Sequence, residues 1–93
     1  MMDFYQEHEY QQFMDEGKSM IYYAELSESR RDFLTAKSRY FSAATSYQNA
    51  ARFAEKYDEI IKQNEAKLKY DYCLAQACEM VYKYDDAMIE NEL

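Results

Sequence analysis

The chain has 93 residues, with no proline, a single glycine and a formal net charge of −7 at pH 7. A chain of this length forms at most one domain, and its acidity argues against general binding to nucleic acid or to an anionic membrane. Helix breakers are almost absent and no run of alternating β-branched residues is present. The composition therefore predicts a single all-α domain over residues 1–93, either a helical hairpin or a small three- to four-helix bundle, in compact or elongated form.

The first predicted segment is an acidic N-terminal helix within residues 1–17. Its apolar residues form a loose amphipathic pattern, and Gly17 suits a helix C-cap because glycine accepts the left-handed backbone conformation. Tyrosine is unusually frequent, with 11 copies in the chain. A tyrosine can fill a helical core or form a contact surface with a wet edge. For Tyr5, Tyr10, Tyr22 and Tyr23 both interpretations stay open.

The second predicted segment is a long helix over residues 18–63 with a heptad pattern. Large apolar residues alternate with alanines, including Ala36, Ala43 and Ala50, so a second helix can approach closely. Another segment of the chain or a second chain could supply that helix. The segment would be about 70 Å long if straight. A break near residues 27–29 is an equal alternative, because Ser29 and Asp32 resemble a helix N-cap and Ser29 is the one polar seam position. The large residues of this packing seam are Tyr22, Leu26, Phe33, Tyr40, Tyr47, Tyr57 and Ile61.

The last predicted segment is a helix over residues 66–93 with its own apolar seam. Its phase is shifted by one residue from that of the long helix, which predicts a turn between Lys62 and Lys69, with Asn64 as the best turn residue. The seam residues expected to face the core are Tyr70, Leu74, Ala77, Val81, Tyr84 and Met88.

Charge is distributed unevenly along the chain. Acidic residues dominate residues 1–16 and 70–93, whereas basic residues dominate residues 29–54. The acidic ends could fold over the basic middle, or all three could be ordinary solvated helix faces. We identify Asp85, Asp86 and Glu90 as a candidate acidic patch.

No motif for catalysis, cofactor binding or metal binding stands out. His8 is the only histidine, and no glutamate lies three residues before it, as bundle di-iron sites require. Cys73 and Cys78 are five residues apart, so on a helix they point in different directions and cannot bridge. They indicate free thiols in a reducing, cytoplasmic compartment. No apolar run reaches membrane-spanning length, and the acidic N-terminus is unlike a signal peptide.

Two functional hypotheses follow. The first is a non-enzymatic interaction module that packs against another protein, including a second copy of itself as a dimer. The alternative is a small acidic phage or mobile-element inhibitor that blocks a nucleic-acid-binding protein by DNA mimicry. A metal-dependent bundle enzyme is a third reading, and it would require bound metal in the purified protein.

Overall fold

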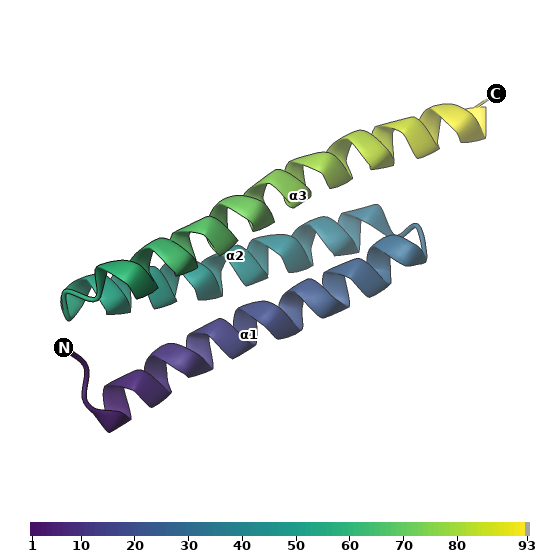
Figure 1. Cartoon of the computed structure of the whole chain (residues 1–93). Coiled ribbons are helices and arrows are strands. Elements are labelled where there is room, and N and C mark those ends of the chain that lie inside the picture. Colours follow the sequence, from purple (N-terminus) through teal and green to yellow (C-terminus); the bar gives the residue numbers. More distant parts are fainter. Residues whose placement is uncertain (93) are drawn as a thin grey trace.

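Three α-helices and no strand make up residues 1–92, the part of the chain that the computed structural model describes. Helix α1 spans Phe4–Ser29, α2 spans Phe33–Lys56 and α3 spans Ile60–Glu92 (Figure 1). The predicted all-α class is confirmed. The molecule measures 58 × 17 × 13 Å, so it is elongated, because helices of 24 to 33 residues lie side by side. The predicted end of the last helix, residue 93, lies outside the described residues.

Helix α2 lies at the centre of the arrangement. Both α1 and α3 pack along its length, whereas α1 and α3 hardly approach each other (Figure 1). The chain runs up, down and up, so α1 and α3 point the same way. The result is an open three-helix bundle in which α2 contributes the largest set of buried residues.

The helix boundaries differ from the predicted ones. The single helix over 18–63 is wrong: the chain turns at residues 30–32 and again at residues 57–59. The first turn follows directly after the break predicted near 27–29. However, Asp32 caps α2 by accepting from the Thr35 backbone N–H at 3.3 Å, whereas Ser29 donates to the Leu26 carbonyl. The predicted turn near Asn64 is also wrong, since α3 already begins at Ile60.

The C-terminal ends of α1 and α2 have the same backbone motif. At the end of α1, Arg31 has a φ of 61° and the Asp32 N–H donates to the Ser27 carbonyl at 2.9 Å. At the end of α2, Asp58 has a φ of 57° and the N–H of residue 59 donates to the Ala54 carbonyl at 2.9 Å. Each is a Schellman motif, which satisfies terminal carbonyls through a left-handed residue. Glycine usually fills that position, so an Arg and an Asp there concealed both helix ends.

Gly17 is not a C-cap, contrary to the prediction. Helix α1 continues through it, and Gly17 is buried. A Cβ atom at this position would lie 2.6 Å from the ring of Tyr47 on α2. Glycine therefore serves here to let the two helices approach, with the tyrosine ring occupying the space of the missing side chain.

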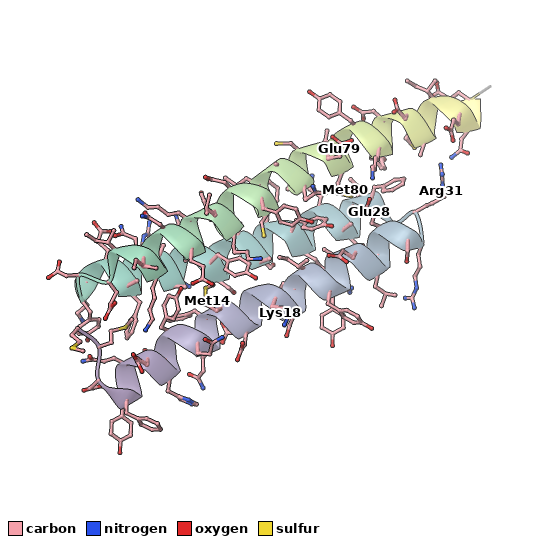
Figure 2. The ribbon with its side chains drawn as sticks, in the orientation of Figure 1. Met14, Lys18, Glu28, Arg31, Glu79 and Met80 are labelled. Carbon is pink, nitrogen blue, oxygen red and sulfur yellow. The ribbon has the colours of Figure 1, made fainter. Side chains whose placement is uncertain are left out.

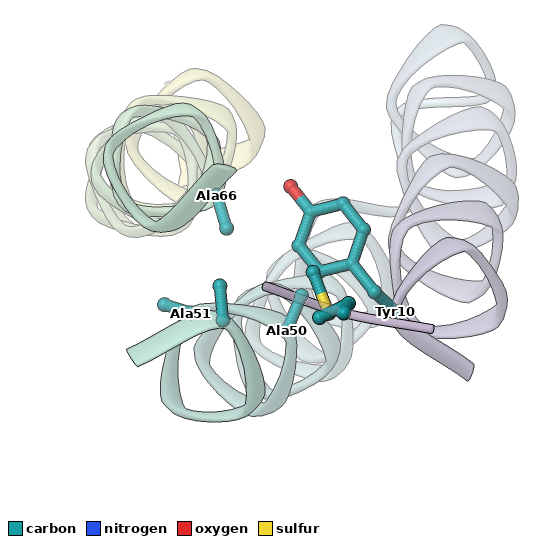
Figure 3. Packing of buried hydrophobic residues seen from close by; sticks show 6 residues of the cluster. Tyr10, Ala50, Ala51 and Ala66 are labelled. Atoms are coloured by element: carbon teal, nitrogen blue, oxygen red, sulfur yellow. The ribbon is translucent and has the colours of Figure 1, made fainter. Parts of the chain in front are cut away.

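The predicted seam is buried only in its middle part. Phe33, Tyr40 and Tyr47 are buried between the helices of the same chain, and Leu26 and Tyr57 are half-buried. Tyr22 and Ile61 are exposed, because the two turns take these residues out of the path of α2. Figure 3 shows the close packing at one end, where Tyr10 of α1 lies over Ala50 and Ala51 of α2 and Ala66 of α3.

The buried face of α3 matches the predicted one in part. Of the predicted seam, Ala77 is buried, and Tyr70, Leu74 and Tyr84 are half-buried against the core. The fully buried residues of α3 are Ala66, Cys73, Ala77 and Met80. Val81 and Met88, which were expected to face the core, are 42% and 45% exposed. Figure 2 shows Met80 directed toward α2 and Glu79 directed away from it. Small residues dominate this face because α2 approaches it closely.

Candidate protein interaction surfaces

A row of exposed apolar residues runs along the side of α3 that faces away from α2. Three of its members, Leu68, Ala75 and Tyr82, each lie two residues after a buried residue of α3 (Ala66, Cys73 and Met80). Two residues correspond to a rotation of about 200° around a helix, so the row lies nearly opposite the buried face. The exposed fractions of the four large residues range from 55% to 84%. We call this the outer row: Ile61, Leu68, Ala75, Tyr82 and Ile89, at every seventh position.

Two acidic rows flank the outer row, at offsets of three and four residues. Asn64, Tyr72 and Cys78 interrupt them, and neither row contains a lysine or an arginine. Asp85 and Asp86 of the predicted acidic patch belong to these rows. Glu90 does not, because it turns toward the α1–α2 loop and pairs with Arg31 at 3.1 Å. The six flanking carboxylates, all exposed, are Glu65, Asp71, Glu79, Asp85, Asp86 and Glu92.

A groove of about 850 Å³ separates α1 from α3 in the middle of the molecule. Tyr47 of α2 lies at its base, Met14 and Ile21 line it from α1, and Leu68 and Tyr72 line it from α3. Figure 2 shows Met14 and Lys18 along the α1 side. Its charged lining has both signs, so the groove has no strong preference for a charged ligand. These charged residues are Asp15, Lys18, Glu25, Glu65 and Lys69.

Two ion pairs connect α1 to α3, one beyond each end of this groove along the helices. Lys62 pairs with Glu7 at 3.2 Å, and Lys83 pairs with Glu28. Both pairs join residues 55 positions apart, so the two helices run in one constant register. The hydrogen bond to Glu28 raises the pKa of the Lys83 amine.

Glu28 also joins α1 to α2. Its carboxylate accepts a hydrogen bond from the Tyr40 hydroxyl at 3.2 Å. Burial, and then the charge of Glu28, raise the pKa of Tyr40. Beside it, Arg39 donates to the Tyr23 carbonyl and to the hydroxyl of Ser27, the buried polar residue of α1. These bonds tie the three helices together at one end. A cavity of about 380 Å³ lies beside them, with Glu28 and Lys83 in its lining.

Tyr10 ties the other end. Its hydroxyl donates to the Lys62 carbonyl of α3 at 3.0 Å, and the side chain is only 4% exposed. Burial, followed by the charge of Glu65, raises the pKa of Tyr10 to about 12. Of the four tyrosines left open above, Tyr10 therefore belongs to the core, whereas Tyr5, Tyr22 and Tyr23 are exposed.

This pKa predicts a specific loss of stability at high pH. In the unfolded chain the tyrosine ionises near pH 10, whereas in the folded protein it stays neutral. The contribution of neutral Tyr10 to the free energy of unfolding is therefore complete below pH 10 and is lost as the pH rises toward 12. Between pH 9 and 11, wild type should lose about 1.4 kcal/mol relative to Tyr10→Phe. Urea unfolding of both proteins at each pH measures this, because lysine titration is common to both. Tyr5→Phe, at an exposed position, should show no such difference from wild type. A constant gap between wild type and Tyr10→Phe would contradict the assignment.

The two cysteines differ in environment. Both are free thiols, as expected from their spacing; Cys73 is buried and Cys78 is exposed. Burial raises the pKa of Cys73 to about 11, against a smaller lowering by Lys69. Only Cys78, which lies in a flanking row of the outer face, is therefore open to thiol reagents.

Among the described residues, no group of three or more His, Cys, Asp or Glu side chains is placed to hold a metal ion. His8 is exposed on α1. None of the helices over residues 4–92 is long and apolar enough to cross a membrane.

Sequence reasoning missed the outer row as a surface. Ile61 was assigned to the buried seam, and Leu68, Tyr82 and Ile89 received no role. The seven-residue spacing that defines the row is visible in the sequence and could have identified it.

The fold and these surfaces define an elongated, open three-helix bundle with an apolar stripe between acidic rows on one outer helix. Comparisons with profiles of known families, with curated proteins and with solved structures gave no significant match.

Proposed function

We propose that this protein is a non-enzymatic interaction module that binds another protein through the outer face of α3. The outer row supports this proposal most directly. It runs for about 42 Å from Ile61 to Ile89 at 1.5 Å per residue. Single exposed apolar residues are normal on a protein surface, but a line of large exposed apolar residues along one side of a helix is typical of an interaction site.

Burial of the outer row would contribute free energy to such a contact. Full burial of an exposed Leu or Ile side chain contributes about 1.5–3 kcal/mol. The large residues of the row together exceed the lower estimates of the cost of association, about 4 kcal/mol. The interior of α3 is complete without them, because Ala66, Cys73 and Met80 already fill the contact with α2. The row is therefore free to bind a partner without rearrangement of the bundle.

Site-specific photo-crosslinking in cells tests this function. A benzophenone amino acid replacing Tyr82 should give a discrete protein adduct, because Tyr82 lies in the outer row and is 68% exposed. The same probe replacing Gln12, an exposed residue of α1, is the matched control and should give none. The adduct at position 82 should also disappear when Leu68→Ser is added. Absence of any adduct from position 82, or equal labelling from position 12, would rule out this surface as the binding site.

A second candidate is the acidic phage or mobile-element inhibitor that acts by DNA mimicry. The observation that favours it is the pair of carboxylate rows on a rigid helix, which include Asp85 and Asp86. In this case DNA would compete for the partner, and neutralising both residues together with Glu90 would weaken binding. Leu68→Ser and Tyr82→Ser would leave DNA mimicry intact but would abolish docking through the outer row. The two variant sets therefore separate the two functions.

A further inference from the structure

The charge around the outer row specifies the chemistry of its partner. We propose that the outer face of α3 binds a basic amphipathic helix of another protein, with apolar residues at heptad spacing between lysine or arginine side chains. This inference rests on the proposed function and adds the identity of the partner class.

The first argument is the concentration of uncompensated negative charge. All six flanking carboxylates are exposed, and none of them forms an ion pair with another described residue. Of the four lysines of α3, Lys62 and Lys83 pair with Glu7 and Glu28 of α1, and Lys67 and Lys69 are exposed on either side of Leu68. The six carboxylates outnumber these two lysines, and the excess of negative charge is greatest from Glu79 to Glu92. A positively charged partner would complement this face, and such complementarity governs both specificity and association rate.

The second argument excludes a second copy of this chain as the preferred occupant. Two outer faces packed together, in parallel or antiparallel orientation, would bring rows of carboxylates against each other. Like-charge juxtaposition at an interface is unfavourable, as it is at the flanking positions of coiled coils. The predicted seam that could have driven self-association is already used within the chain, where Phe33, Tyr40 and Tyr47 are buried.

The third argument concerns the apolar row itself. A surface that imitates nucleic acid needs carboxylates alone, whereas here Ile61, Leu68, Tyr82 and Ile89 separate the two acidic rows along their whole length. A single apolar row between charged rows is narrower than a coiled-coil seam, which has two apolar rows, but it can contact one apolar row of a partner helix while the acidic rows face that helix's basic residues. The complementary ligand is a helix of about four heptads with the opposite charge.

Two synthetic peptides of 28 residues test the proposal with the full chain. Both carry leucine at heptad positions a and d; one has lysine at positions e and g, and the other has glutamate there. Fluorescence anisotropy should show that the lysine peptide binds at least tenfold more tightly than the glutamate peptide. Its affinity should fall at least fivefold between 50 and 300 mM NaCl, because exposed charge pairs are screened by salt.

The protein carries its own reporter of where the peptide binds. Cys78 lies in a flanking row and is exposed, so bound lysine peptide should slow its alkylation at least fivefold, with buried Cys73 as the internal reference. Leu68→Ser with Tyr82→Ser should abolish binding and protection. Tyr5→Ser, at an 81% exposed residue of α1, is the matched control and should change neither.

Equal affinity for the two peptides, or binding without protection of Cys78, would overturn the proposal. Concentration-dependent dimers that Leu68→Ser removes, seen by light scattering in the absence of peptide, would replace the basic helix with a second copy. A positive photo-crosslink at position 82 combined with no preference for the lysine peptide would leave the proposed function standing and refute only the partner class.

Discussion

Replacing Met80 by alanine is expected to destabilise the fold by about 2–5 kcal/mol, the range for truncating a large buried side chain. Met80 is fully buried on α3, in a cluster with Ala24, Phe33, Ala36 and Tyr40. The side chains of the neighbouring alanines are too short to move into the resulting cavity, so the structure can relax only partly. Urea unfolding at pH 7, followed by circular dichroism, measures the loss.

Met88→Ala is the matched control, because it makes the same substitution on the same helix at a residue that is 45% exposed. Its effect should stay within about 0.5 kcal/mol, as for most surface substitutions. The pair also tests which face of α3 is buried, since the sequence pattern placed Met88 inside and the structure places Met80 inside. A larger loss for Met88→Ala than for Met80→Ala would restore the sequence-based assignment.

Gly17→Ala is expected to destabilise the protein by about 1 kcal/mol, the middle of the net range given by overpacking and helix propensity, although alanine is the better helix former. The new Cβ would lie 2.6 Å from Cε2 and Cζ of Tyr47, and the tyrosine is only 3% exposed. Overpacking of this kind costs about 1–3 kcal/mol, which offsets the gain of about 1 kcal/mol in helix propensity. Thermal and urea unfolding of the purified variant would give the sign.

A double-mutant cycle isolates the contact. In a Tyr47→Leu background the ring is absent, so Gly17→Ala should become stabilising by about 1 kcal/mol through helix propensity alone. Ser19→Ala, at an exposed position of the same helix, should be mildly stabilising in both backgrounds. Strictly additive effects of Gly17→Ala and Tyr47→Leu would show that the ring does not limit the approach of α1 to α2.

The sequence predicted the helical class and the core of α2 because both depend on simple signals. Absence of proline and scarcity of glycine leave helix as the default, and α2 is covered on two sides, so its heptad pattern is broad and regular. The boundaries were harder to predict. Arg31 and Asp58 adopt left-handed conformations that sequence rules reserve mainly for glycine. Gly17, the one glycine, serves helix packing instead.

The seven-residue spacing of the outer row is visible in the sequence, but hydrophobicity alone does not show which row of α3 is exposed. Its buried face carries Ala66, Cys73 and Ala77, and its exposed face carries Ile61, Leu68 and Tyr82. Close approach to α2 favours small side chains at Ala66, Cys73 and Ala77, although Met80 on the same face is large and fully buried. The heptad pattern continues in the sequence through the turn at residues 57–59. Ile61 was therefore assigned to the buried seam of the long helix, although it lies in the exposed outer row of α3.

The central position of α2 also has a consequence for how the chain folds. Almost every interhelical contact joins helices that are neighbours in sequence, α1 with α2 or α2 with α3. Such a topology has a low contact order, and helical proteins of this kind fold in microseconds to milliseconds. Each hairpin can start the process without waiting for the distant end of the chain. Stability is therefore concentrated in two helix–helix interfaces that share α2.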